Sequence, residues 1–192
     1  MSIPAPPPPA TLVLSILSAK WDLFWPALLG RLEAAFGPAD FVSAPLAFDR
    51  TAYYEREFGA PLSRRILGFA RPVPQDSLAD VKLATNAVED DLRGEDCRRI
   101  VNLDPGLITP ERLVLATGKN FTHRVYLGKG IFADLTLIYQ KGDWKALPWS
   151  FPDYASPEIR AILTELRLRH LARRESAPRA ARDKRNTRCS SA

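Results

Sequence analysis

The chain has 192 residues, of which 46% are hydrophobic and 26% are charged, so it resembles an ordinary globular domain with enough length for one substantial core. Its two cysteines, Cys97 and Cys189, lie far apart, which argues against a disulfide scaffold or a cysteine-based zinc site. The apolar run at residues 12–17 is far shorter than the ~20 residues that a membrane-spanning helix needs, and no signal-peptide pattern precedes it. We therefore expect a cytoplasmic protein.

The net charge of +5 is concentrated at the C-terminal end. From Glu165 onward the chain carries nine basic and three acidic residues, a net charge of +6, which leaves −1 for the rest. Five of the seventeen prolines fall within the first ten residues. We predict a disordered proline-rich tail at residues 1–10, a single domain at residues 11–174 and a disordered basic tail at residues 175–192.

The first half of the chain predicts three strands and two helices. Residues 11–18 are rich in β-forming side chains, and residues 41–48 and 62–70 give two further strands. A helix beginning near Asp22 has an apolar stripe and ends at Gly37-Pro38. A second helix is predicted to start at an Asp76 cap and to end at Gly94.

Lys82 and Glu89 lie on the polar side of this second helix, where we expect them to face solvent. A fourth strand is expected at residues 99–103. Asp104, Pro105 and Gly106 then have the residue types of a type II turn. Thr109-Pro110 is typical of a helix start and predicts a short helix through residue 115.

Residues 121–127 and 131–139 alternate in polarity around Gly128-Lys129-Gly130, which predicts a β-hairpin. Its register places Leu127 opposite Ile131, Tyr126 opposite Phe132 and Arg124 opposite Asp134. The simplest interpretation of the last pair is an ion pair on a solvated sheet face. The functional alternative is that Asp134 holds Arg124 in position to bind an anion. His123 should point to the opposite face, as a core histidine. A final helix is predicted to begin at Ser156-Pro157.

The predicted order through residue 103 is β-α-β-β-α-β, the order of a ferredoxin-like fold. The sequence therefore predicts an α+β protein whose ferredoxin-like core is extended by a β-hairpin and a C-terminal helix.

Several segments together resemble an uncharacterised prokaryotic family, domain of unknown function 4416. They begin at Phe48 (FDRTAYYEREFG), Val81 (VKLATNAVE), Arg98 (RRIVNLDPGLIT), Leu113 (LVLATGKNFTHRVYLGKGIFADLTLIY) and Leu147 (LPWSFPDY). The resemblance spans residues 12–171 and implies no established activity. Family members usually carry glutamate where this chain has Asp134.

Some members of that family are labelled GTP-binding, but the residues here argue against a conventional GTPase. A phosphate-binding loop needs the pattern GxxxxGK[ST]. In this chain Asn120 follows Gly118-Lys119, and Leu113 stands where the first glycine belongs. Both ends of the motif are therefore wrong.

Three classes of function remain open, of which the third is a structural or scaffold protein with no ligand. The first is a small-molecule site for an anionic, phosphate- or carboxylate-bearing ligand, in a binding protein or an enzyme of unknown reaction. We name no metal ligands: two histidines are too few for a histidine-rich site, whereas a magnesium site made of carboxylates alone stays open. Its candidate residues are Arg99, Asn102, Asp104, Lys119, Arg124 and Asp134, with Tyr53 and Tyr54 as a candidate lid. The alternative is a module that binds nucleic acid or another polyanion weakly and nonspecifically through the basic C-terminal tail.

Overall fold

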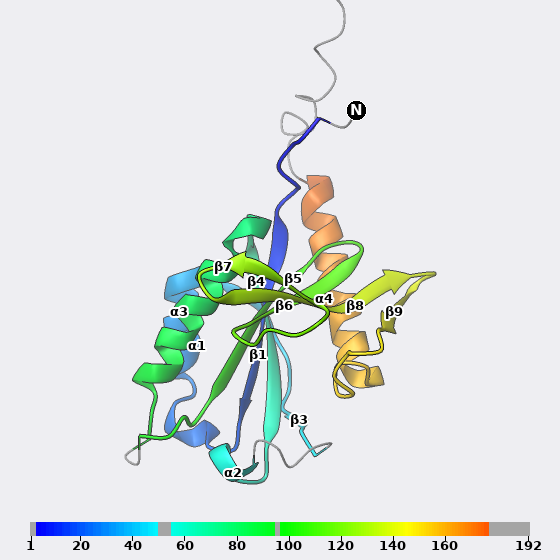
Figure 1. Ribbon diagram of the computed structural model, residues 1–192. Coiled ribbons are helices and arrows are strands. Elements are labelled where there is room, and N and C mark those ends of the chain that lie inside the picture. Colours follow the sequence, from blue (N-terminus) through cyan, green and yellow to red (C-terminus); the bar gives the residue numbers. More distant parts are fainter. Residues whose placement is uncertain (1–2, 50–54, 95–96, 177–192) are drawn as a thin grey trace, which may run out of the picture.

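The computed structural model describes residues 3–49, 55–94 and 97–176 of the chain (Figure 1). Its elements, in chain order, are β1 (Ala10–Ser18), α1 (Ala27–Phe36), β2 (Ala39–Val42), β3 (Leu46–Ala47), α2 (Glu55–Phe58), β4 (Ser63–Val73), α3 (Leu78–Asp91), β5 (Asn102–Ile108), β6 (Arg112–Thr117), β7 (Arg124–Gly128), β8 (Ile131–Gln140), β9 (Asp143–Ala146) and α4 (Pro157–Ser176). Short 3-10 turns at Trp21–Leu23 and Gln75–Ser77 precede α1 and α3.

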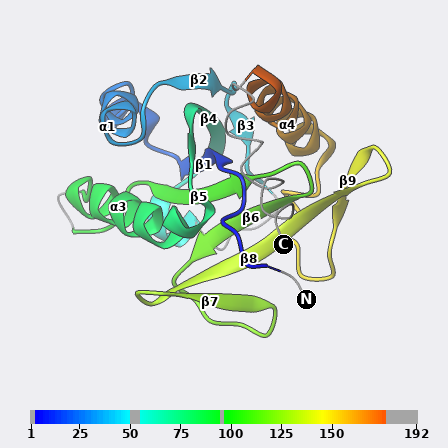
Figure 2. The same ribbon diagram turned by 90° about the horizontal axis from the view of Figure 1, so that it is seen from above.

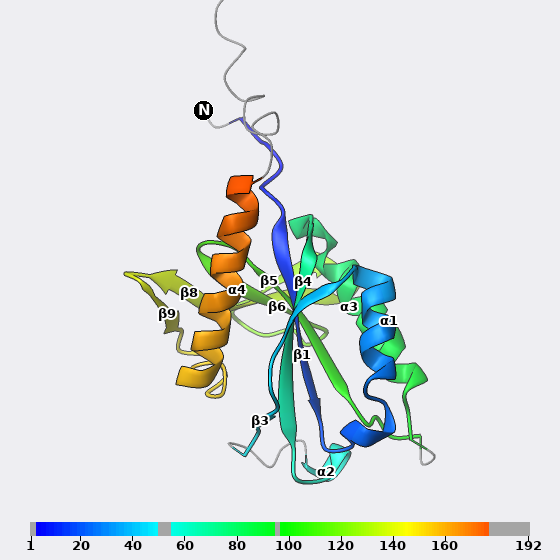
Figure 3. The same cartoon turned by 180° about the vertical axis from the view of Figure 1, so that it is seen from behind.

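All nine strands belong to one antiparallel sheet. Seven of them follow the order β2-β4-β1-β5-β6-β8-β7, while β3 pairs with β4 and β9 pairs with β8. Helices α1 and α3 cover one face and α4 covers part of the other (Figures 2 and 3). The protein is therefore α+β, with helices on both faces of a large sheet.

The burial of β1 follows from this layering. All nine of its residues are buried, because β4 and β5 flank the strand and helices lie over both faces. Leu12, Leu14 and Ile16 pack in the core shared with α1 and α3, whereas Val13 packs in the core shared with α4. This alternation is the two-residue period of a strand whose two faces are both apolar.

The sequence predicted the long local patterns well. Helix α1 buries Leu28 and Leu32, and α4 begins at Pro157 and buries Ile159, Leu163 and Leu166. The strand predicted at residues 41–48 is two short strands, β2 and β3, and Asp76 lies within the 3-10 turn before α3 rather than at a cap.

Two predicted elements are wrong. Asp104, Pro105 and Gly106 do not form a type II turn, because they lie inside β5 and pair with Ser15, Leu14 and Val13. The predicted helix at residues 109–115 is absent, since its second half is strand β6, which pairs with β5 and β8. Leu113 and Leu115, two residues apart, lie on one face of β6 and are buried there. This segment therefore follows the two-residue period of a strand, although Thr109-Pro110 is typical of a helix start.

Among the described residues, no helix is long and apolar enough to cross a membrane.

Candidate functional site

The six candidate residues form two groups. Arg99, Asn102 and Asp104 belong to a polar network between α3 and β5. Arg124 and Asp134 pair in the hairpin of β7 and β8, and Lys119 joins them through its backbone oxygen. The groups are separate because β6 and β8 lie between β5 and β7, whereas a single site required β5 and the hairpin to be neighbours.

The first group lies at an open stretch of strand edge. Strand β5 pairs with β1 along its whole length but with β6 only from Gly106 onward. At Leu103, side chains of α3 occupy the place of the missing strand. The Leu103 N–H donates to Glu89 Oε1 at 2.6 Å, and Lys82 Nζ donates to the Leu103 carbonyl oxygen at 2.8 Å. Both backbone groups are thereby satisfied.

These contacts correct the expectation that Lys82 and Glu89 face solvent. Both residues are buried, and their charged atoms lie 3.9 Å apart. Burial raises the pKa of the Glu89 carboxyl, and the neighbouring Lys82 ammonium opposes that rise. Lys82 also contacts Asp104 Oδ1 at 3.4 Å, and the Asn102 amide donates to Asp104 Oδ2 at 2.6 Å.

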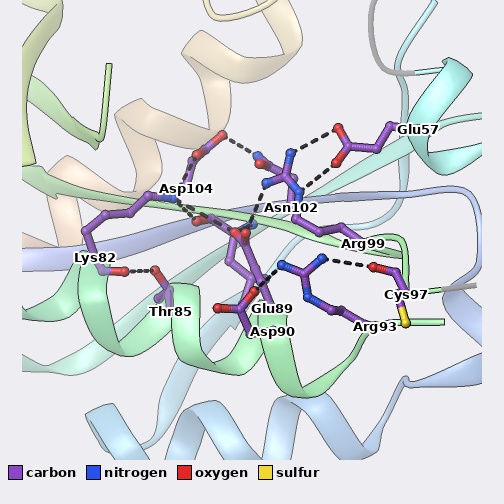
Figure 4. Close-up of polar contacts among 11 residues, drawn as sticks. Glu57, Lys82, Thr85, Glu89, Asp90, Arg93, Cys97, Arg99, Asn102 and Asp104 are labelled. Carbon is purple, nitrogen blue, oxygen red and sulfur yellow. Dashed lines mark hydrogen bonds and ion pairs between the residues drawn. The ribbon is translucent and has the colours of Figure 1, made fainter. Parts of the chain in front are cut away.

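Arg99 lies at the other end of this network and joins Glu57 to Glu89 (Figure 4). Its Nε and Nη2 donate to the two carboxylate oxygens of Glu57 at 2.7 and 3.0 Å, and its Nη1 donates to Glu89 Oε2 at 3.1 Å. The hydrogen bond to Glu57 is the main cause that raises the pKa of Arg99. All three guanidinium nitrogens are therefore occupied by carboxylates.

The charges of the network do not favour an anionic ligand. Two cations, Arg99 and Lys82, face the three carboxylates of Glu57, Glu89 and Asp104. The side chains of Lys82 and Glu89 are at most 9% exposed. An anion would therefore have to displace a carboxylate from a cation. We interpret this group as the element that holds α3 against β5.

The second group surrounds a buried carboxylate. Strands β7 and β8 pair Arg124 with Asp134 and Tyr126 with Phe132, which confirms the predicted register at both positions. At the hairpin end Gly128, not Leu127, faces Ile131, because a bulge intervenes. Asp134 is only 3% exposed, so its contact with Arg124 is not the solvated surface pair that the simplest interpretation assumed.

Arg124 is held at two of its three nitrogens. Its Nε donates to Asp134 Oδ2 at 2.8 Å and its Nη1 donates to the Lys119 carbonyl oxygen at 2.9 Å. Its Nη2 makes no hydrogen bond within the described part of the chain, and 12% of the Arg124 side chain is exposed. One donor pair of a fixed guanidinium thus has no protein partner among the described residues.

His123 approaches the same carboxylate, contrary to the expected opposite orientation. Its Nε2 lies 3.3 Å from Asp134 Oδ2. The alternation rule does not apply because β7 begins only at Arg124, so His123 precedes the regular strand. The imidazole stacks on the Trp149 indole, with centroids 4.9 Å apart and planes 9° apart, and meets the Phe121 ring edge-on.

Trp149 and Phe121 are two residues of this site that were not predicted from the sequence. Both are partly exposed, at 38% and 62%. The Trp149 Nε1–H donates to the Leu135 carbonyl oxygen at 2.8 Å, which ties the indole to β8 beside Asp134. Nothing local in the sequence joins residue 149 to the hairpin, because the contact depends on the chain returning after β9.

The two groups share a face of the sheet. Gly106 pairs with Leu115 and Leu115 with Asp134, so all three positions point the same way, as does Asp104 two residues before Gly106. For a regular sheet, two strand spacings and a two-residue step put Asp104 and Asp134 about 12 Å apart at their Cα atoms. The two groups are therefore neighbours on this face of the sheet.

A third polar feature was not predicted. Arg64 on β4 lies in the wall of a cleft of about 280 Å³ bounded by β3 and the start of α4. Its guanidinium carbon is 4.9 Å from the Phe48 ring centroid and 4.8 Å from that of Tyr154, and it pairs with Asp153. The carboxylates of Asp49, Asp153 and Glu158 line the same cleft, so its overall charge does not favour an anion.

The candidate lid residues Tyr53 and Tyr54 lie outside the described residues. Within the described ranges, no three or more His, Cys, Asp and Glu side chains are grouped so that they could hold a metal ion.

The structure defines an α+β protein whose open sheet edge is closed by helix side chains, with a buried carboxylate in the adjoining hairpin. The family model described as "Domain of unknown function (DUF4416)" matches residues 8–170, and the chain belongs to that family. No curated protein and no solved structure matches the chain.

Proposed function

We propose that the protein binds a small molecule with an anionic group, at the site formed by Arg124, Asp134, His123 and Trp149. The observation that supports this proposal most directly is the way in which the Arg124 guanidinium is held. This guanidinium is fixed by the buried Asp134 carboxylate and the Lys119 carbonyl, while Nη2 has no hydrogen-bond partner among the described residues and the side chain is 12% exposed. A held guanidinium with an unused donor pair suits phosphate or carboxylate oxygens.

A comparison of the three arginine environments supports this choice. Every nitrogen of Arg99 is bound to a carboxylate, and the network around it has more acids than bases. Arg64 lies in a cleft with three carboxylates. At Arg124, one carboxylate faces one guanidinium, so an added anion meets no excess of negative charge.

The neighbouring rings give the proposed ligand a second feature. Trp149 is stacked on His123 and keeps part of its surface in solvent, and the exposed Phe121 contacts the same imidazole. This imidazole and the Arg124 guanidinium meet at the Asp134 carboxylate, and such a combination of rings and guanidinium suits a planar, aromatic ligand that carries the anionic group. We propose an aromatic anion, such as a nucleotide, ahead of a simple inorganic ion.

We further propose that β1, α1, β2, β4, α3 and β5 form a ferredoxin-like core. The antiparallel order β2-β4-β1-β5, with α1 and α3 on one face, supports this classification. The alternative function, polyanion binding through residues 175–192, depends mainly on residues outside the described ranges and stays a prediction from charge alone. A cytoplasmic location also stays a prediction from the sequence.

Ligand screening on the full chain tests the proposed site. Inorganic phosphate, nucleotides and small carboxylates are added to the wild type, and the thermal midpoint is recorded; hits are titrated calorimetrically. We expect a nucleotide to raise the midpoint, and Arg124→Lys to weaken its binding about tenfold, because lysine keeps the charge but loses the fixed planar donor.

Arg31→Lys is the matched control, since Arg31 forms an exposed ion pair with Asp91 on a distant helix. It should leave binding unchanged. Trp149→Ala should weaken a nucleotide more than phosphate, because phosphate has no ring to stack. The proposal is wrong if no compound stabilises the wild type, or if Arg124→Lys and Arg31→Lys bind equally well.

A further inference from the structure

The open strand edges of the sheet differ in whether polar side chains bind their free backbone groups. At β5, Glu89 and Lys82 occupy the backbone groups of Leu103. At the outer strand β2, Glu33 Oε1 accepts the Ala39 N–H at 2.9 Å and Arg169 Nη1 donates to the Asp40 carbonyl oxygen at 2.7 Å. Polar side chains thus cap both of these edges, which hinders pairing with another strand.

Strand β7 forms the opposite end of the sheet (Figure 2). Within the described ranges it pairs with β8 alone. Among the described residues, no side chain makes a hydrogen bond to the backbone of Val125, Tyr126 or Leu127. Every second N–H and C=O of a strand points away from its single partner, so this edge offers donors and acceptors to a further strand.

The side chains on this edge are also unusually apolar. Val125 is 67% exposed, Tyr126 61% and Leu127 41%, and no charged residue interrupts the three. Natural edge strands commonly carry a lysine, a proline or an inward-pointing charge that prevents pairing. The central residues of β7 have none of these features, which indicates an edge that is covered in the working protein.

We propose that β7 pairs antiparallel with β7 of a second copy of the chain, which joins two sheets across a two-fold axis. This inference is independent of the anion site. A two-fold pair gives each copy the same strand as its partner, so the open backbone groups are satisfied reciprocally. The strand is five residues long, within the usual length of a sheet strand.

Charge and composition favour a second copy over the other segments of this chain. The two cations that flank the apolar stretch are neutralised within their own chain, Arg124 by Asp134 and Lys129 by Asp80. Two copies therefore meet without unpaired like charges at this edge. The N-terminal segment has proline at positions 4 and 6–9 and lacks the N–H groups that a ladder needs.

The test measures the mass of the full chain by sedimentation velocity over about a hundredfold range of concentration. We expect the wild type to dimerise, and Val125→Lys to raise the dimer dissociation constant at least about tenfold, because it places two ammonium groups in the paired edge. Leu127→Lys should act in the same direction. Leu168→Lys, at an exposed position on α4, is the matched control and should dimerise like the wild type.

Hydrogen exchange then locates the interface. Amides of residues 125–127 should exchange more slowly as the wild-type concentration rises, and not in Val125→Lys. A wild type that stays monomeric overturns the proposal. A dimer that both lysine variants leave intact, or one that gives residues 125–127 no added protection, shows that the copies associate elsewhere and overturns it as well.

Discussion

Glu89 of α3 accepts the backbone N–H of Leu103 at 2.6 Å, in the position where a neighbouring strand would otherwise supply a carbonyl oxygen. The same carboxylate accepts from Arg99 through its other oxygen. One buried side chain therefore satisfies a backbone donor and pairs with two cations, Arg99 and Lys82.

Removal of this carboxylate should be costly. We expect Glu89→Ala to lower the free energy of unfolding by about 3–5 kcal/mol, because it leaves the buried Leu103 N–H without its acceptor and removes one of the two carboxylates beside the buried Lys82 ammonium. Glu89→Gln should cost less, since its amide oxygen still accepts the Leu103 N–H. Urea denaturation measures both. Asp91→Ala, which removes only an exposed ion pair, should cost at most about 1 kcal/mol, and a similar small loss in Glu89→Ala would contradict the assigned role.

His170 on α4 should make stability depend on pH. Burial lowers the pKa of His170, as do the nearby Arg174, Arg173 and Arg167, while Glu111 opposes this shift. Its Nδ1 lies 3.1 Å from the Thr11 hydroxyl. The unfolded chain therefore binds a proton at a higher pH than the native chain does. Stability from this group is complete above the ordinary histidine pKa of about 6.5 and is lost as the pH falls below it.

The difference between wild type and His170→Asn isolates this contribution, because Glu89, whose pKa is raised, titrates in both proteins. We expect the wild type to lose more unfolding free energy than His170→Asn between neutral and mildly acidic pH. Parallel pH profiles for the two proteins would show that folding leaves the pKa of His170 unchanged, which would contradict the prediction.

Gly106 should not tolerate a side chain. A Cβ at this position would lie 2.7 Å from Leu115 Cδ2 and 2.9 Å from the Val114 backbone oxygen. Because backbone cannot move aside cheaply, Gly106→Ala should destabilise by about 1–3 kcal/mol. Gly30 in α1 offers the contrasting case, since an added Cβ meets nothing within 4 Å. Gly30→Ala should stabilise by roughly 0.5–1 kcal/mol, and thermal or urea unfolding of the two variants should therefore shift in opposite directions.

Arg64 should depend on its planar shape as well as its charge. Arg64→Lys can keep a salt bridge to Asp153 but loses the guanidinium plane between the Phe48 and Tyr154 rings. We expect a loss of about 2 kcal/mol for such a buried cation–π arrangement. Arg31→Lys serves again as the exposed control and should change stability little. Equal urea midpoints for the two variants would mean that the stacking contributes nothing measurable.

The parts of this fold that the sequence predicted are those with a long local period. The apolar stripe of α1 and the alternation of β7 and β8 each repeat within one element, and Arg124 opposite Asp134 follows from the hairpin alone. Such patterns need no knowledge of the rest of the chain.

The wrong predictions depended on distant partners. Pro105 suggested a turn, but the structure places it in β5 next to the stretch that lacks a second neighbouring strand, where a missing N–H is tolerated. In the sequence, Lys82 and Glu89 have the pattern of an ordinary polar helix face. Their burial follows only from the open edge of β5, which lies against them in the fold. Arg64 meets Asp153 across 89 residues of sequence, and no local period connects them.

The two α3 side chains at the open edge of β5 also fix how the helix is placed relative to the strand. Lys82 and Glu89 are two helical turns apart, yet both reach the backbone of Leu103. Apolar packing alone allows a helix to slide or roll by small amounts over a sheet, whereas these two bonds fix both its rotation and its position along the strand. A single inserted residue between them would turn one end of α3 by about 100° relative to the other and separate the pair from its strand. The number of residues between Lys82 and Glu89 therefore cannot change without loss of the contacts that satisfy the open edge of β5.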